Sequence, residues 1–254
     1  MTEIVTTRQD SVLCVGFNRP GKKNAITSDM YLALIAALQS ASADAGVRAV
    51  LIHGSDEAFT AGNDLADFLG KKSIGKPASH QFLDALMNFD KPLIAAVSGV
   101  AVGIGTTLLL HCDFVYASTS ARLALPFVNL GVVPEAGSTY LLTRLAGYQR
   151  AAELMLLGEP FSAEKAKEVG LVNEVVAPDR LMETALATAR KLAQKPPAAV
   201  RLTKALMKQG TAAAATQANA AELKLFAERL GSPEAKEAMT AFLEKRKPDF
   251  SQFD

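Results

Sequence analysis

Apolar and polar residues alternate over the first seventeen positions of the chain, a pattern typical of paired strands. The alternation predicts strands at Ile4–Arg8 and Val12–Phe17, joined by a turn at Asp10 and Ser11. The chain is therefore expected to open with a β-hairpin.

A helix and a further strand follow the hairpin. Residues rich in Ala and Leu continue from a cap at Ser28 or Asp29 to about Ala43, and the apolar run Ala49–His53 predicts the next strand. The order of strand, strand and helix recurs around residues 93–116. This recurrence indicates an α/β fold.

The C-terminal part of the chain carries only helical patterns. We expect a core over residues 1–195 and a helical C-terminal region over residues 196–254, which covers the binding site or a neighbouring subunit. The helical patterns run through Ala198–Lys208, Ala215–Leu230 and Pro233–Lys245.

A glycine-rich turn between a strand and a helix is the first candidate for chemistry. Leu93–Val97 predicts a strand, Gly99, Gly103 and Gly105 allow tight turns, and Thr106–His111 continues as an apolar helix. The first amide N–H groups of a helix lack partners and carry partial positive charge, so this turn can hold a developing oxyanion. A phosphate-binding loop is disfavoured, because no Lys-Ser or Lys-Thr pair follows and the full G-x-G-x-x-G pattern is missing.

Glu135 is the candidate proton carrier, because it is the only carboxylate between Asp113 and Glu153. Its apolar neighbours remove it from water on folding, which raises its pKa and makes it useful near neutral pH. An ordinary loop acid after Pro134 is the alternative, since loop acids are common. The apolar neighbours are Leu125, Phe127, Val128, Leu130, Val132 and Val133.

Composition narrows the possible partners. The chain has 254 residues, 49% of them hydrophobic, so it can bury a large core, and its net charge is +1. No basic run appears beyond Lys245–Lys247, which argues against nucleic-acid and membrane partners. The N-terminal residues show no targeting pattern, and no stretch has the character of a membrane span. We therefore expect a cytoplasmic protein of bacterial origin.

Cysteines and histidines give no sign of a disulfide or a metal. Cys14 and Cys112 lie in apolar runs, which is typical of buried thiols in a reducing compartment. His53, His80 and His111 lack the spacing of metal ligands, so we expect no metal site.

Six segments that span nearly the whole chain share their order and spacing with one family: FNRPGKKNAI, AFTAGNDL, KPLIAAVSGVAVGIG, CDFVYAS, LPFVNLGVVPEAGSTY and FLEKRK. On these segments the chain resembles the crotonase, or enoyl-CoA hydratase/isomerase, superfamily. The resemblance implies a crotonase-like ββα spiral that binds acyl-CoA over residues 1–195. Residues 196–254 then form a lid and an oligomerisation region, and the protein is expected to be a homotrimer or a dimer of trimers.

The resemblance also implies an acyl-CoA thioester substrate and the residues that hold it. Family members bind the thioester oxygen with two backbone N–H groups, which here are the amides of Asn63 and Ile104. Lys22 and Lys23 are either solvated lysines of a turn or, as the resemblance favours, point charges beside the phosphates of CoA. No cofactor is expected, because coenzyme A is part of the substrate. The other expected contacts are Ala58, Ala61, Gly62, Asp64, Leu65, Gly103, Thr107, Phe127, Phe242 and Lys245.

Two further segments border the expected pocket. Gly70–Ser79, with its glycines, lysines and proline, is either a solvated connector or a gate over the acyl group. Arg19 and Asn24 are expected to brace the turn that carries Lys22, and Asp64 to brace the oxyanion amide beside it.

The acids at three positions separate the reactions of the family. Hydratases that resemble the liver enzyme use two glutamates, and this chain has Thr107 and Phe127 at those positions, which offer neither a base nor an acid for adding water. Peroxisomal-type Δ3,Δ2-enoyl-CoA isomerases use one acid, at the position of Glu135. The resemblance therefore favours moving a double bond from 3-enoyl-CoA to 2-enoyl-CoA, with Glu135 as both acid and base. The alternatives are hydration by other residues, dehalogenation or decarboxylation, and a non-catalytic acyl-CoA- or RNA-binding scaffold.

Overall fold

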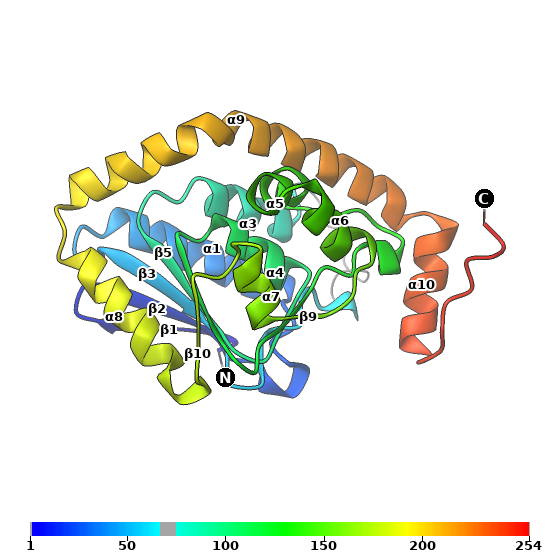
Figure 1. Cartoon of the computed structure of the whole chain (residues 1–254), viewed down its shortest axis with the longest axis horizontal. Helices are drawn as coiled ribbons and strands as arrows, with labels where there is room; N and C mark the ends of the chain where they lie inside the picture. The colour runs from blue at the N-terminus through cyan, green and yellow to red at the C-terminus, as the bar shows by residue number, and fades with distance from the viewer. Residues whose placement is uncertain (1, 67–74, 254) are drawn as a thin grey trace.

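Two β-sheets surrounded by helices make up the protein in the computed structural model, which describes residues 2–66 and 75–253 (Figure 1). The strands are β1 (Ile4–Gln9), β2 (Val12–Phe17), β3 (Ala49–His53), β4 (Ala58–Thr60), β5 (Leu93–Val97), β6 (Val100–Val102), β7 (Phe114–Ser118), β8 (Arg122–Ala124), β9 (Phe161–Ser162) and β10 (Glu174–Val176). The larger sheet has the order β1-β2-β3-β5-β7-β10 and the smaller one β4-β6-β8-β9. Only the pairs β1–β2 and β8–β9 are antiparallel among these strands.

Helices connect the strands and form the C-terminal end. The α-helices are α1 (Ser28–Ala43), α3 (Ala78–Met87), α4 (Ile104–Thr107), α5 (Ser138–Ala146), α6 (Tyr148–Leu156), α7 (Ala163–Glu168), α8 (Leu181–Ala193), α9 (Pro197–Leu230) and α10 (Pro233–Leu243). Short 3-10 helices lie at η1 (Pro20–Lys22), η2 (Leu108–His111), η3 (Val128–Leu130) and η4 (Pro178–Arg180).

The chain winds as a spiral in which each turn adds one strand to each sheet. It passes from β3 to β4 and on to α3, then from β5 to β6 and α4, then from β7 to β8 and the helices that follow. Strands added in this way pair in parallel, because a connection always returns the chain to the same end of the sheet. The expected ββα spiral with C-terminal helices is confirmed.

Alternation of side chains sorts the core of the larger sheet into two faces. Val50 and Ile52 of β3 are buried on the face that α1 and α3 cover. Leu51, between them, points to the opposite face and packs with Ile94 of β5 and Leu181 of α8. The larger sheet is therefore covered by helices on both faces (Figure 1).

The predicted hairpin and first helix are present, with one correction. Strands β1 and β2 pair in antiparallel register around a turn in which Asp10 has a φ of 55°. Helix α1 begins at Ser28, but its cap is Thr27, whose Oγ1 accepts a hydrogen bond from the Met30 N–H at 3.3 Å. The prediction of Ser28 or Asp29 was wrong by one or two positions, because several neighbouring polar residues can each cap a helix.

The C-terminal helices also differ from the prediction. The separate patterns at 198–208 and 215–230 belong to one continuous helix, α9, which arches over the molecule (Figure 1). Gly210 lies in its middle, where a glycine costs only about 1 kcal/mol relative to alanine and strong helix formers surround it. Helix α10 ends at Leu243, before Lys245, which adopts a left-handed φ of 55°.

Within residues 2–66 and 75–253, no helix combines the length and the apolar character needed to cross a bilayer.

Candidate active site

Most of the expected site residues line one cavity of about 810 Å³. It lies where the turn after β4, the turn before α4 and the segment before η3 meet α9 and α10. Apolar side chains dominate its wall, among them Val102, Leu130, Phe226 and Met239. Ten of the expected residues line it: Lys22, Ala61, Gly62, Asn63, Asp64, Leu65, Gly103, Ile104, Phe127 and Phe242.

Two glycines let the two turns approach each other. Gly62 has a φ of 89°, and a Cβ on it would lie 2.8 Å from the carbonyl oxygen of Val102. Gly103, with a φ of 56°, precedes Ile104 at the start of α4. Among the described residues, the amides of Asn63 and Ile104 donate no hydrogen bond. The cavity wall therefore contains two amide N–H groups that are free to bind an oxyanion.

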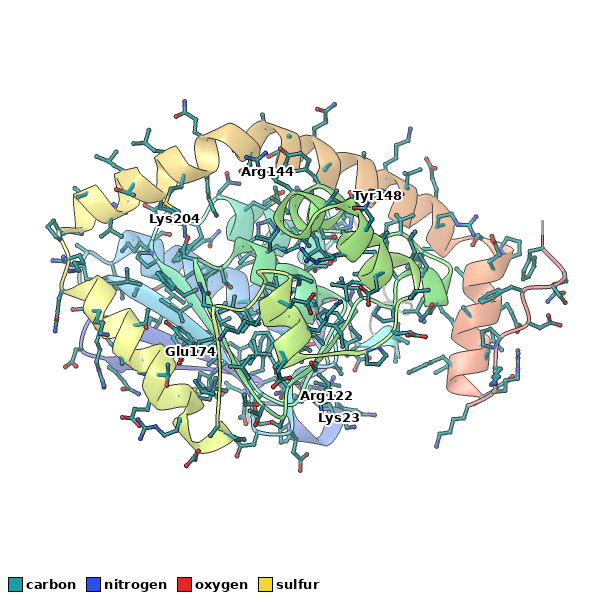
Figure 2. The ribbon with its side chains drawn as sticks, viewed as in Figure 1. Lys23, Arg122, Arg144, Tyr148, Glu174 and Lys204 are labelled. Carbon is teal, nitrogen blue, oxygen red and sulfur yellow. The ribbon has the colours of Figure 1, made fainter. Side chains whose placement is uncertain are left out.

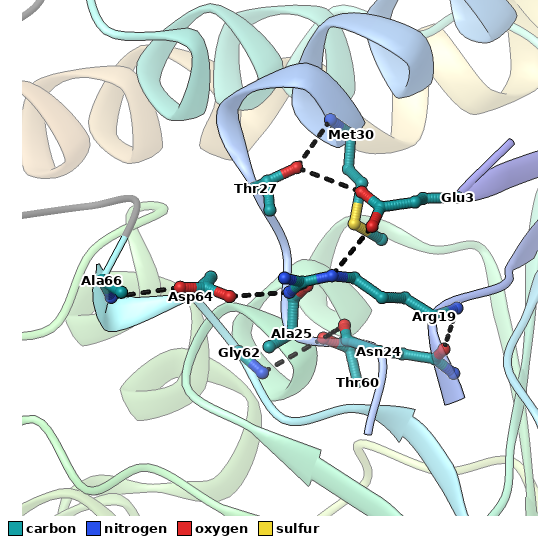
Figure 3. Close-up of polar contacts among 10 residues, drawn as sticks. All are labelled: Glu3, Arg19, Asn24, Ala25, Thr27, Met30, Thr60, Gly62, Asp64 and Ala66. Atoms are coloured by element: carbon teal, nitrogen blue, oxygen red, sulfur yellow. Dashed lines mark hydrogen bonds and ion pairs between the residues drawn. The ribbon is translucent and has the colours of Figure 1, made fainter. Parts of the chain in front are cut away.

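Polar contacts hold the first of these turns in place (Figure 3). Arg19 donates from Nη1 to Oδ2 of Asp64 at 2.6 Å and to the carbonyl of Ala25 at 2.9 Å. Asn24 is 1% exposed and donates from Nδ2 to the carbonyl of Ala58 at 2.8 Å. The expected bracing by Arg19, Asn24 and Asp64 is confirmed.

The Asn63 side chain has a further support that the sequence does not reveal. The Tyr31 hydroxyl, from α1, donates to Oδ1 of Asn63 at 2.6 Å. On the backbone, the Ile26 N–H donates to the Gly62 carbonyl at 2.8 Å. Tyr31 follows the apolar spacing of α1 and is indistinguishable in the sequence from an ordinary core residue.

Glu135 is buried, with 7% of its surface exposed. The pKa of its carboxyl is raised to about 8, mainly by desolvation; the hydrogen bond from the Thr107 hydroxyl lowers this pKa, and the charge of Glu222 contributes to the rise. That hydrogen bond, from Oγ1 to Oε1, measures 2.5 Å. A carboxyl with this pKa can both take up and release a proton near neutral pH. The expected rise in the pKa of Glu135 is confirmed, and its role as proton carrier stays a prediction.

Glu135 lies in the segment between η3 and α5 and is not among the residues that line the cavity. Its partner Thr107 is in α4, whose first residue is Ile104. Burial, and after it the charge of Glu135, raises the pKa of Tyr31, the hydroxyl that holds the Asn63 side chain. The carboxyl therefore has neighbours on α1 and on α4, the helices that support the two turns.

The backbone after Glu135 has an unusual conformation held by His111. Ala136 has a φ of 66°, which is uncommon for a residue with a Cβ. Burial lowers the pKa of His111 to about 4, so its ring is neutral, and Nε2 donates to the Ala136 carbonyl at 2.8 Å. In the sequence, His111 gave no signal apart from its lack of metal-ligand spacing.

Four expected contacts lie outside the cavity wall: Ala58, Lys23, Lys245 and Thr107, the last of which is fully buried beside Glu135. Ala58 is 1% exposed within β4. Lys23 uses its carbonyl to accept from the Ala61 N–H at 2.9 Å, and Figure 2 shows it at the lower edge of the molecule, away from α10. Lys245 lies two residues beyond the end of α10, and the neighbouring Arg246 lines the cavity instead.

Residues 70–74 of the predicted gate lie outside the described residues, and residues 75–79 lie within them. From residue 75 onward, Lys76 forms an ion pair with Asp84, and α3 begins at Ala78. Over the described part of the chain, no group of three or more His, Cys, Asp or Glu side chains is arranged to hold a metal ion.

Comparison with known proteins gives consistent matches along the whole chain. The family profile "Enoyl-CoA hydratase/isomerase" matches residues 7–253. The 2,3-dehydroadipyl-CoA hydratase of Escherichia coli (strain K12) is 36% identical over 98% of this chain and 99% of its own. Enoyl-CoA delta isomerase 2 of Rattus norvegicus is 37% identical over 96% of this chain and 64% of its own.

Solved structures agree with these matches. An enoyl-CoA hydratase/isomerase from Pseudoalteromonas atlantica T6c superposes with a TM-score of 0.94 at 39% identity, covering 98% of this chain and all of the other. OdaA of Pseudomonas aeruginosa has a TM-score of 0.92 at 45% identity, covering 96% and 99%. Relatives named as hydratases and as isomerases are similarly distant, so overall identity does not separate the two reactions.

Proposed function

This chain belongs to the enoyl-CoA hydratase/isomerase family, and from that premise we propose that it converts 3-enoyl-CoA thioesters into 2-enoyl-CoA thioesters. One observation carries the proposal. Glu135 is a buried carboxyl with a pKa of about 8, while the two positions at which family hydratases carry glutamates have Thr107 and Phe127.

The proposed reaction is a proton shift across an allylic system. The carboxylate of Glu135 removes a proton from C2, and the electron pair moves onto the thioester oxygen between the amides of Asn63 and Ile104. The double bond then re-forms between C2 and C3 as Glu135 returns the proton to C4. The negative charge passes from the Glu135 carboxylate to the dienolate and returns when C4 is protonated, and the fixed N–H dipoles stabilise the dienolate in between.

The surroundings of Glu135 support isomerisation over hydration. Thr107 donates its hydroxyl hydrogen to the carboxyl and brings no second acid. Phe127 puts an aromatic ring on the cavity wall, where it gives water neither a base nor an orienting charge. A panel of CoA thioesters assayed for double-bond migration and for water addition tests the proposal, and isomerisation is the expected activity.

Hydration is the second candidate function. The relatives named 2,3-dehydroadipyl-CoA hydratase and short-chain-enoyl-CoA hydratase are 36% and 34% identical to this chain, which favours it. Glu135 would then work with an acid other than residues 107 and 127.

Lys22 is proposed to pair with the phosphates of CoA. Its side chain is at the cavity wall, whereas Lys23 lies outside it. We expect Lys22→Ala to raise KM for CoA thioesters roughly five-fold with little change in kcat, since an exposed charge pair contributes up to about 1 kcal/mol. Lys23→Ala is the matched control. Equal affinity of parent and Lys22→Ala for CoA at low salt would remove Lys22 from the site.

The C-terminal helices are proposed to act as lid and assembly surface. Phe226 of α9 and Phe242 of α10 line the cavity of their own chain. The apolar side chains that remain exposed include Leu202, Leu206 and Met207 on α9, at 65%, 70% and 77% exposure. Such exposure is typical of a surface that a partner covers.

A trimer or a pair of trimers is the expected assembly. Light scattering at micromolar concentration measures it directly, and a clean monomer would contradict the proposed role of residues 196–254 in assembly.

A further inference from the structure

Glu222 of α9 reaches the loop that carries Glu135. Its carboxylate is buried, with 5% of the residue exposed. It accepts hydrogen bonds from the Gly137 N–H at 2.6 Å, the Thr139 N–H at 2.9 Å and the Thr139 hydroxyl at 2.5 Å. Three donors of one loop therefore depend on a carboxylate that lies 83 to 85 positions further along the chain.

These contacts replace a local helix cap. Gly137 occupies the cap position of α5 and has no side chain with which to accept a hydrogen bond. The Gly137 N–H is buried, and a buried N–H without a partner is costly. Glu222 meets that need from α9, which passes over α5 (Figure 1).

One peptide unit is held at both of its polar atoms. His111 donates to the carbonyl oxygen of Ala136, and Glu222 accepts from the N–H of Gly137. These two atoms belong to the peptide that immediately follows Glu135. Ala136 and Gly137 both have a φ of 66°, a conformation that persists only where surrounding contacts enforce it.

Helix α9 is itself anchored, so it can act as a fixed support. Lys204, in its N-terminal half, is 7% exposed and forms an ion pair with Asp113 at 2.7 Å (Figure 2). Lys204 also donates to the Lys91 carbonyl at 2.7 Å. The helix is thus tied to the core on the N-terminal side of Glu222 as well as at Glu222.

We propose that Glu222 is a positioning residue, which sets the orientation of the Glu135 carboxyl by holding the Ala136–Gly137 peptide against His111. The inference rests on the proposed role of Glu135 as the base. Glu222, Phe226 and Leu230 follow one another at intervals of four residues on α9, and the last two line the cavity. Helix α9 therefore carries both Glu222 and part of the cavity wall.

The charges and polar groups around Glu135 make the inference measurable. Thr107, Tyr31 and Glu222 are the groups that face it through a hydrogen bond or through charge, and the neutral His111 holds its loop. The negative charge of Glu222 raises the pKa of Glu135. Removing that charge lowers this pKa, so the pH at which the base becomes ionised falls.

The test compares Glu222→Gln with Glu228→Gln, an exposed glutamate on the same helix, using 3-hexenoyl-CoA and crotonyl-CoA as probes. Glutamine retains one acceptor oxygen but places an NH₂ group against one of the loop donors. We expect kcat to fall on the order of ten-fold with KM nearly unchanged, because a misplaced base slows the chemical step. The rising limb of kcat/KM against pH should also move to lower pH, whereas Glu228→Gln should match the parent.

Two further variants keep the outcome decisive. Glu222→Asp retains the charge but withdraws it from the loop, so kcat should fall without the shift to lower pH. If Glu222→Gln does not fold, the kcat of Glu222→Asp decides, and a parental value overturns the inference. Glu135→Gln is measured in parallel: an active variant refutes the proposed function. If Glu135→Gln is inactive while Glu222→Gln keeps the parental kcat and pH profile, only the role of Glu222 is refuted.

Discussion

Replacing Glu135 by Gln is expected to lower the rate of isomerisation by on the order of 10²-fold or more, the scale of losing a general base. Glutamine is close in size and keeps an oxygen that can accept the hydrogen bond from Thr107, so the loop should remain folded. The loss should appear in kcat with KM little changed, because the carboxyl acts on the reacting proton and does not hold CoA.

The pH dependence of the parent supplies an independent check. Glu135 must be ionised to remove the C2 proton, and burial places its pKa at about 8. Activity in kcat/KM should therefore increase as the pH rises through that value. Glu159→Gln, an exposed acid elsewhere in the chain, is the matched control. Near-normal turnover by Glu135→Gln would exclude Glu135 from the mechanism.

Hydration of crotonyl-CoA is expected to be at least about 10²-fold slower than isomerisation of a 3-enoyl-CoA, the factor that one positioned acid or base supplies. Adding water requires one group to activate it and another to protonate the α-carbon. Thr107 is engaged as a donor to Glu135, and Phe127 is apolar. Both rates are measured on the same preparation. Hydration is followed by the loss of the absorbance of the conjugated thioester, and isomerisation by the appearance of that absorbance.

The double variant Thr107→Glu with Phe127→Glu extends this prediction. It should raise hydration, because it restores carboxylates at the two positions that the family's hydratases use. Glu135 is close to residue 107, so like charges would raise the pKa values in the cluster and lower the stability of the fold. A parent protein that hydrates as fast as it isomerises would show that positions 107 and 127 do not decide the reaction.

Local patterns predicted the elements whose structure is determined locally. Alternation was sufficient for β1 and β2, and the apolar run for β3, because each pattern has the period of a strand. The raised pKa of Glu135 followed from its apolar neighbours in the sequence. The continuity of α9 could not be predicted from the sequence, because Gly210 and the polar residues beside it resemble a break between two helices when their packing is unknown.

The supports of the site could not be predicted, because each joins distant parts of the chain. Tyr31 lies 32 positions from Asn63, His111 lies 25 from Ala136, and Glu222 lies 85 from Gly137. No periodic pattern relates such pairs. Glu222 has the sequence context of an exposed helical acid, and only the crossing of α9 over α5 shows that it is buried.

The burial of Glu135 also has a thermodynamic consequence for the folded state. The folded protein binds this proton more tightly than the unfolded chain, with a pKa of about 8 against an ordinary value of 4.5. The stability contributed by the protonated carboxyl is complete below pH 4.5 and is lost as the pH rises through 8. The pH range in which the base is ionised and reactive is therefore the range in which its burial costs the most folding free energy.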